Sequence, residues 1–377
     1  MEREKWLDTL KGLACLIVFL DHFYLAFRPQ LEGVEAFLNI KPFAILINGN
    51  FAVCLFLLIS AYIISSSVYC HRSFEAIQKI AFKRYFRLMP PIFFASILSL
   101  VISKTIGYFN DEVGAILNNG WLTGFFSQEL TVGNMIKTSL VDVWWKGNSI
   151  FNGPFWMLYI MFLGTFLVII LSIITATGKK GGVLVLSCVL GIYLYLEDYL
   201  FCMVLGNILG YLKCNTEFFS KWNKNNICIV ISVMLLLSAF YLPAYQIEIM
   251  DGISKIGIRN IFKNRIFYNG MGSFFLVFSV MGLSKIKTFL GRSTILDRIN
   301  EISFSIYLVH WPIISSFSCF VYLKLSDSFQ QNMGMFMLML FVCTVIVVLV
   351  FSKLFYEVIE KRVCNKFVKK ICNSYFG

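Results

Sequence analysis

The sequence predicts an all-α fold: a polytopic membrane helix bundle of about ten transmembrane helices with both termini in the cytoplasm. The first observation is composition. Of 377 residues, 58% are hydrophobic and 14% are charged, whereas about 25% of a soluble domain is charged. The second is that windows of about 18 or more apolar residues recur along the chain, and each is long enough as a helix to cross the roughly 30 Å hydrocarbon core. The third is the distribution of Lys and Arg around these windows.

The apolar windows place ten expected spans, of which the fifth and sixth are short. They run over residues 7–27, 43–68, 89–108, 154–176, 182–197, 199–213, 226–246, 266–284, 302–324 and 333–356. With the first residue inside, the inner segments hold 21 Lys and Arg residues and the outer segments hold 9. Cytoplasmic loops of membrane proteins carry such an excess, so both termini are expected in the cytoplasm. Residues 1–360 then form one membrane domain, and residues 361–377 form a short basic cytoplasmic tail.

Composition also limits the partners and cofactors. The net charge of +12 is explained by the sidedness of Lys and Arg, so membrane lipid is an expected partner and nucleic acid is not. The 11 cysteines are scattered, mostly within apolar runs, without a C-x-x-C pair or zinc-ligand spacing. Neither a metal site nor a disulfide framework is therefore expected.

The first span carries an unusual string of ionisable residues, although charge within a lipid-spanning helix is costly. Lys11 and His22 are eleven residues apart, which puts both on one helix face, about 16 Å apart along the axis. Asp8 precedes Lys11 by three residues, a spacing that allows an ion pair. Asp21 points about 100° away from its neighbour His22. Either these groups serve a function, or Asp21-His22 marks the outer interface while Lys11 extends towards the inner one.

A basic cluster, KRYFRLMPP, stands at residues 83–91, directly before the third span. Arg84 and Arg87 are three residues apart and share a helical face, and Lys83 lies beside them. The cluster either anchors the helix at the inner surface or binds an anion, because guanidinium groups grip phosphates in a bidentate manner.

The ninth span is interrupted by the sequence His310-Trp311-Pro312. Proline removes a backbone hydrogen bond, which is tolerated in a span only where neighbouring groups or water satisfy the freed atoms. His310 is either a buried neutral histidine bonded to another helix or a substrate contact. The longest gap, residues 109–153, carries Trp121, Trp144 and Trp145, which serve as interface anchors or as a platform for sugar rings.

Five stretches together resemble one family. LDTLKGLACLIVFLDHF, NFAVCLFLLISAYIIS, KRYFRLMPP, GPFWMLYIMF and SFSIYLVHWPI occur in that order from residue 7 to about residue 315. They are similar to the first-helix, second-helix, paired-arginine, Trp and Tyr-x-x-His elements of the acyltransferase-3 family of integral-membrane O-acyltransferases. Members of that family acetylate bacterial surface polysaccharides and related glycans.

The resemblance implies a function and a set of site residues. An acetyl or longer acyl group would pass from cytoplasmic acetyl-CoA, a substrate and not a permanently bound cofactor, to a hydroxyl of a surface or lipid-linked glycan in the bacterial inner membrane. His22 would be the catalytic base or acyl carrier, because a histidine within reach of a hydroxyl can take its proton. The implied groups are the catalytic residues His22, Asp21 and Lys11, the donor-binding residues Arg84, Arg87 and Lys83, and the substrate-binding residues His310, Trp156 and Tyr307.

The chain departs from the family pattern at three places. Lys11 stands where arginine is usual, Ala61 replaces a common glycine, and the segment after Trp156 has Tyr159 and Met161 where many relatives carry an acidic residue. Two other classes of protein remain open on the residues alone. A transporter also lines its pathway with intramembrane charges, but the internal repeats common in transporters are absent from the sequence. A structural membrane partner would not explain a histidine and a lysine on one face.

Overall fold

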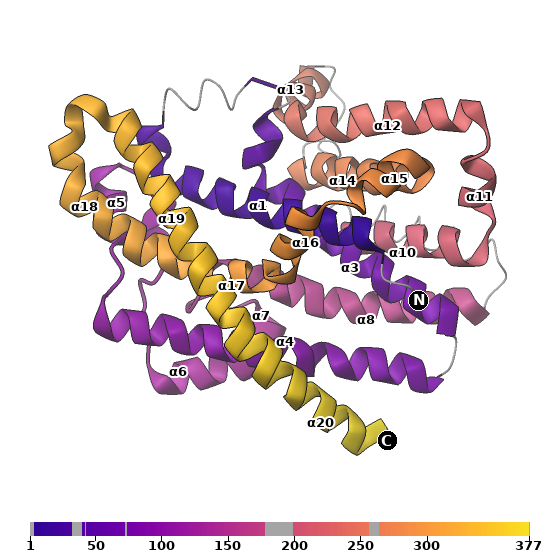
Figure 1. The fold of residues 1–377 in the computed structure, drawn as a ribbon, viewed down its shortest axis with the longest axis horizontal. Coiled ribbons are helices and arrows are strands. Elements are labelled where there is room, and N and C mark those ends of the chain that lie inside the picture. Colours follow the sequence, from indigo (N-terminus) through magenta and orange to yellow (C-terminus); the bar gives the residue numbers. More distant parts are fainter. Residues whose placement is uncertain are drawn as a thin grey trace. The chain divides into compact units, whose positions relative to one another are not determined.

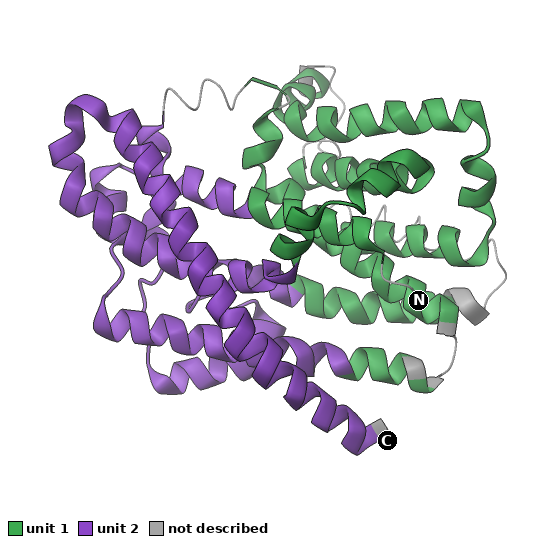
Figure 2. Cartoon of the chain, viewed as in Figure 1, with its two compact units in different colours: residues 1–17, 40–82, 160–300 green, residues 18–39, 83–159, 301–377 purple. Residues whose placement is uncertain are grey.

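The structure, a computed structural model, describes residues 4–31, 40–41, 43–71, 74–177, 199–255 and 264–376. Within these ranges every regular element is a helix, so the predicted all-α class is confirmed (Figure 1). The chain divides into two compact units (Figure 2). Unit 1 comprises Met1–Ile17, Ile40–Phe82 and Ile160–Asn300, and unit 2 comprises Val18–Asn39, Lys83–Tyr159 and Glu301–Gly377.

Three long helices contribute residues to both units: α1 (Lys5–Phe27), α4 (Phe74–Thr105) and α8 (Trp156–Thr177). In unit 1, α3 (Gly49–His71) packs against α10 (Leu200–Asn215) and α14 (Arg265–Gly282). The helix α12 (Asn226–Ala244) packs against α14. The shorter helices of this unit are α11 (Phe218–Trp222), α13 (Gln246–Lys255), α15 (Ser284–Leu290) and α16 (Thr294–Glu301).

Two glycines set the close contact between α10 and α3. Gly206 and Gly210 are four residues apart and lie on one face of α10. A Cβ atom on Gly206 would collide with the Leu58 carbonyl oxygen, and one on Gly210 would collide with the Ser65 hydroxyl. Small residues at such spacing let transmembrane helices approach backbone to backbone, which supplies the van der Waals contact that holds them together in lipid.

In unit 2, the helices α17 (Ser303–Ile313) and α18 (Cys319–Leu325) lead into α19 (Met333–Phe355) and α20 (Asn365–Phe376). Helical structure is continuous from Ser303 to Tyr375, but Phe329 has non-helical angles of φ −116° and ψ 15°. The chain reverses there, and α19 packs back along α17 (Figure 1). The helices before and after this reversal run antiparallel, and they correspond to the expected spans 302–324 and 333–356.

The segment expected as a long outer gap folds into short helices of unit 2. They are α5 (Asn110–Ile116), a 3-10 turn (Leu122–Gly124), α6 (Val132–Lys137), a π-helix (Thr138–Asp142) and α7 (Val143–Lys146). The three tryptophans of this segment differ in burial. Trp144 is fully buried, Trp145 is 62% exposed and Trp121 is 37% exposed, so Trp144 is a core residue and not an interface anchor.

Six described segments are long and apolar enough to cross a membrane, and a seventh arises if α14 and α15, bent by 103°, form one span. The six are Lys5–Gln30, Gly49–Cys70, Ile77–Thr105, Gly153–Ile174, Asn226–Ala244 and Ser303–Tyr375. The expected span at 182–197 lies outside the described residues, and that at 199–213 corresponds to the 16-residue helix α10. The chain is an integral membrane protein, while ten spans and the cytoplasmic termini stay predictions.

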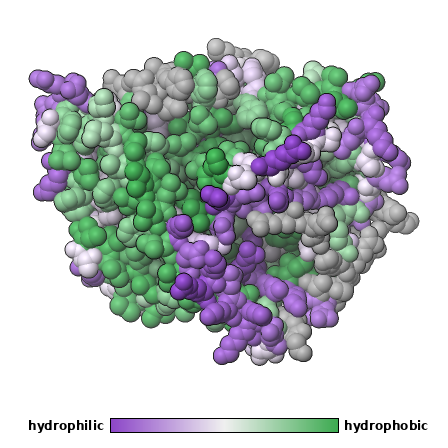
Figure 3. Space-filling model, in the orientation of Figure 1, coloured by the Kyte–Doolittle hydropathy of each residue, from purple (hydrophilic) through white to green (hydrophobic). Residues whose placement is uncertain are grey.

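The surface of α19 agrees with contact to lipid. Apart from Lys353 in the last turn, its large exposed side chains are apolar and include Met335, Leu338, Val342, Ile346, Val350 and Leu354. Figure 3, in the orientation in which α19 lies in front in Figure 1, shows an extensive apolar surface over much of the left half of the view. The predicted basic tail at 361–377 corresponds to the end of a π-helix (Tyr356–Cys364) and to α20.

Candidate active site

The candidate site begins with the break in α17. Pro312 has no N–H, which leaves the carbonyl of Leu308 without its helical donor. The side-chain Nδ2 of Asn152 donates to that carbonyl oxygen at 2.6 Å, and the Ser316 hydroxyl donates to the Pro312 carbonyl oxygen at 2.6 Å. A π-helix (Ile314–Ser318) follows directly. Side chains thus donate hydrogen bonds to the backbone carbonyl groups on either side of the interruption. Short π-helical segments of this kind are frequent at functional sites.

A pair of histidines, one of them just before Pro312, forms the centre of the site. His310 of α17 lies against His22 of α1, with 2.8 Å between His22 Nδ1 and His310 Nε2. The rings are stacked, with centroids 5.1 Å apart and planes inclined by 20°. His310 is 1% exposed, whereas His22 is partly exposed. Both residues belong to unit 2. The predicted catalytic residue, His22, and one predicted substrate-binding residue, His310, are thus in direct contact.

The hydrogen bonds around His310 determine where the protons lie. His310 Nδ1 is 2.8 Å from the Ile306 carbonyl oxygen, which can only accept, so Nδ1 carries the proton. In neutral His310, Nε2 is then an acceptor and must receive the Nδ1–H of His22. The remaining nitrogen of neutral His22, Nε2, keeps its lone pair. This assignment, inferred from the bonding pattern, makes His22 Nε2 the free basic atom of the pair.

Aromatic side chains surround the pair. The rings of Trp121 and Trp311 lie 5.9 Å and 5.5 Å from the His22 ring, and Phe19 packs edge-on against His310 at 6.4 Å. Trp121 and Trp311 contact each other at 5.1 Å. Since Trp121 is 37% exposed and Trp311 is buried, the aromatic wall has one accessible ring and one buried ring beside the basic histidine.

The other two predicted substrate-binding residues are Tyr307, which lies beside His310, and Trp156. The Tyr307 hydroxyl donates to the Pro154 carbonyl oxygen, and the Tyr307 ring is 6.3 Å from that of His310. Trp156, the first residue of α8, is 36% exposed. Tyr307 therefore holds the Gly153–Phe155 turn, which leads into Trp156.

The remaining predicted catalytic residues have different surroundings. Asp21 directly precedes His22 in α1 and is partly exposed. Lys11 lies in unit 1 and forms the expected ion pair with Asp8 at 2.8 Å. The pair explains how α1 carries two charges in an apolar stretch, because each charge lowers the desolvation cost of the other.

The predicted donor-binding cluster lies on α4 in unit 2. Arg87 is exposed, while Lys83 and Arg84 are partly buried. The charge of Arg87 acts on the carboxylate of Glu360, which accepts a hydrogen bond from the buried Ser305 hydroxyl. Glu360 is therefore an acidic neighbour of the cluster, and when it is ionised it offsets part of the positive charge of Arg87.

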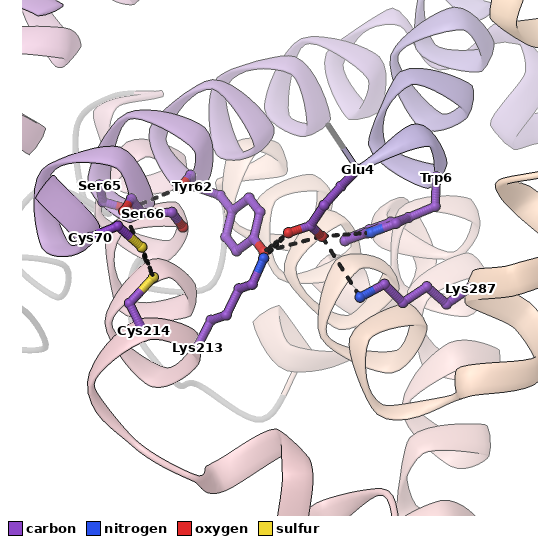
Figure 4. A network of polar contacts seen from close by, with 9 residues as sticks. All are labelled: Glu4, Trp6, Tyr62, Ser65, Ser66, Cys70, Lys213, Cys214 and Lys287. Carbon is purple, nitrogen blue, oxygen red and sulfur yellow. Dashed lines mark hydrogen bonds and ion pairs between the residues drawn. The ribbon is translucent and has the colours of Figure 1, made fainter. Parts of the chain in front are cut away.

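Sequence reasoning missed a second polar cluster, which lies in unit 1 (Figure 4). The Glu4 carboxylate accepts from Trp6 Nε1 at 2.7 Å and from the Tyr62 hydroxyl at 3.2 Å. It pairs with Lys213, and with Lys287 at 3.8 Å. These donors come from four separate helices, so the cluster ties the start of α1 to unit 1. No spacing along the sequence could indicate it.

The fold and the site define an integral membrane protein built of helices, with a stacked histidine pair as its principal chemical feature. The profile of one family, described as an acyltransferase domain, matches residues 4–353. The chain belongs to this family, acyltransferase-3, as the sequence motifs indicated. No curated protein and no solved structure matches the chain. The matched range includes both histidines and the basic cluster, and the family together with the apolar helices indicates a membrane acyltransferase.

Proposed function

We propose that the protein is an O-acyltransferase that moves an acetyl group from cytoplasmic acetyl-CoA to a hydroxyl of a surface or lipid-linked glycan in the bacterial inner membrane. The observation that carries this proposal is the His22–His310 pair, since its bonding pattern leaves a basic nitrogen on His22. An alcohol is a poor nucleophile near neutral pH, and a positioned histidine corrects that by taking its proton as the bond forms.

The transfer can be written with the two histidines, acetyl-CoA and the acceptor hydroxyl alone. His22 Nε2 accepts the proton of the acceptor hydroxyl while its oxygen attacks the thioester carbon. The tetrahedral intermediate then collapses, the carbon–sulfur bond breaks, and the imidazolium returns the proton to the leaving thiolate. The products are the O-acyl glycan and free CoA. His310 Nε2 orients His22 throughout by holding its Nδ1–H.

The same lone pair also permits a two-step route. In that route His22 Nε2 attacks the thioester carbon, the carbon–sulfur bond breaks and CoA leaves as the thiolate, while the acyl-imidazolium keeps its Nδ1–H. The acceptor hydroxyl then attacks the acyl carbon, the bond to Nε2 breaks, and the hydroxyl proton neutralises the thiolate. Both routes consume one acyl-CoA and one hydroxyl group. Trapped acyl label on the protein, in the absence of acceptor, distinguishes the second route from the first.

Lys83, Arg84 and Arg87 are proposed to hold the phosphates of the donor at the cytoplasmic side. Guanidinium groups bind phosphate by paired, charge-assisted hydrogen bonds, which suits the several phosphate charges of acetyl-CoA. The acetyl group would reach His22 along the pantetheine arm. Trp156 and Tyr307 are proposed to lie on the acceptor side. Lys11 and Asp21 are proposed as further catalytic groups of α1, with Lys11 on the same helix face as His22 and Asp21 next to His22 in sequence.

The test is transfer of label from acetyl-CoA to glycan by the purified protein. Wild-type protein is expected to release CoA and to label an acceptor glycan, whereas His22→Asn, which keeps polarity but cannot accept a proton at neutral pH, is expected to lose about 10²–10⁴-fold in rate. If His22→Asn keeps more than about a tenth of the rate, His22 is not the base. No CoA release with any acceptor would instead favour a transporter or a structural membrane partner.

A further inference from the structure

One buried polar atom beside the histidine pair has no explanation in the fold. The Trp311 side chain is fully buried, yet its indole Nε1 has no hydrogen-bond partner among the described residues. A buried N–H left without an acceptor costs about 1–3 kcal/mol. Such donors are rare in folded proteins, and each calls for a specific reason, of which a catalytic role is one.

The position of this N–H relates it to the reacting groups. The Trp311 ring stands at 69° to the His22 ring, with 5.5 Å between centroids, and at 4.6 Å from Phe125. A Cβ atom on Gly153 would lie 3.0 Å from Trp311 Nε1 and 2.6 Å from the Phe125 ring. Glycine at position 153 therefore leaves the indole N–H uncovered, where any other residue would crowd it.

We propose that Trp311 is a further catalytic residue, whose indole N–H donates a hydrogen bond to the acyl carbonyl oxygen during transfer. The inference rests on the proposed function, since it needs the acyl thioester beside His22. When the acceptor oxygen bonds to the carbonyl carbon, the carbonyl π electrons move to oxygen and form an oxyanion. A fixed N–H donor stabilises that charge more than it stabilises the neutral thioester, so it accelerates the reaction.

The competing explanation is structural. Asn152 donates its Nδ2 to Leu308, so its Oδ1 points elsewhere, and Oδ1 is a buried acceptor without a partner among the described residues. One water molecule that accepts from Trp311 and donates to Asn152 would satisfy both atoms. In that case Trp311 would contribute to packing and stability alone.

The substitution Trp311→Phe removes the N–H and keeps an aromatic ring, and Trp144→Phe is its matched control. Trp144 is also fully buried, but it lies in the core, and its indole N–H donates to the Ser139 carbonyl oxygen at 2.9 Å. Trp311→Phe is expected to lower kcat by about 10²–10³-fold, the usual effect of losing one oxyanion donor, with KM for acetyl-CoA almost unchanged. Trp144→Phe is expected to keep kcat. Equal kcat values for Trp311→Phe and wild type would overturn the inference while leaving the acyltransferase function intact.

A spectroscopic measurement separates a hydrogen bond from packing. Acetyl-CoA labelled with ¹³C at the carbonyl is bound to the slow variant His22→Asn, and isotope-edited infrared spectra are recorded. A hydrogen bond from Trp311 lowers the carbonyl stretching frequency relative to free acetyl-CoA, and adding Trp311→Phe restores it. If the frequency is the same with and without the indole N–H, Trp311 does not touch the carbonyl. Absence of wild-type turnover would instead refute the proposed function itself.

Discussion

His22 Nδ1 and His310 Nε2 are 2.8 Å apart, although 288 residues separate them in the chain. The proton on His310 Nδ1 is held by the carbonyl of Ile306, one helical turn earlier. The backbone of α17 thus selects the tautomer of His310, which in turn orients His22. In this arrangement His310 serves His22 as an acceptor without bringing a negative charge into the membrane domain, where an unpaired carboxylate is expensive.

We predict that the acceptor atom at position 310 matters more than the imidazole itself. His310→Gln places an amide oxygen near the position of Nε2, so His22 Nδ1–H keeps an acceptor. His310→Leu offers none and leaves that N–H unsatisfied, which costs about 1–3 kcal/mol. His310→Gln is therefore expected to keep about tenfold more acyl transfer than His310→Leu, at matched protein levels in the membrane. Equal activity of the two variants would mean that His310 does not orient His22.

A second prediction concerns the contact of α10 with α3. Gly206→Val would force a side chain into the Leu58 carbonyl and the Ala61 side chain, and such overpacking costs about 1–3 kcal/mol. We expect a lower midpoint of thermal unfolding for the variant in detergent. Gly252→Ala is the control, because a Cβ atom there meets no neighbour within 4 Å among the residues that the structure describes. A drop of the same size in both variants would show that the effect is not due to the helix contact.

Features within one helix could be predicted from the sequence, whereas contacts between distant helices could not. The Asp8–Lys11 ion pair follows from a spacing of three within one helix. Sequence patterns also indicated His22 and His310 separately. Their contact could not be predicted, because spacing along the chain says nothing of which distant helices meet. The short helices within 109–153 carry too few residues for a periodic pattern, so that segment appeared as a gap.

A third prediction addresses the membrane topology. Reporter fusions after residues 75, 220 and 290 should report the cytoplasm, and fusions near residues 115 and 255 should report the outer side. The 247–265 segment tests the proposal most severely, because its basic residues oppose an outer location. If fusions at 75 and 115 report the same side, α4 does not cross the membrane and the proposed inner location of the donor site fails.

The last prediction concerns the basic cluster on α4. Each of Arg84→Ala and Arg87→Ala removes charge-assisted hydrogen bonds worth about 1.5–3 kcal/mol, or roughly tenfold or more in affinity for acetyl-CoA. Glu360→Gln should act in the opposite direction, because the ionised Glu360 carboxylate lowers the positive potential at Arg87 that attracts phosphate.

Lys104→Ala is the matched control for these variants, because Lys104 is exposed near the other end of α4 and pairs only loosely with Glu129, at 3.5 Å. Calorimetric titration with acetyl-CoA, together with His22→Asn to prevent turnover, measures binding alone. The double variant Arg84→Ala/Arg87→Ala should bind donor far more weakly, and Lys104→Ala should bind it as wild type does. If the double variant keeps its affinity, the cluster anchors α4 at the membrane surface, and the donor phosphates must be held by other residues.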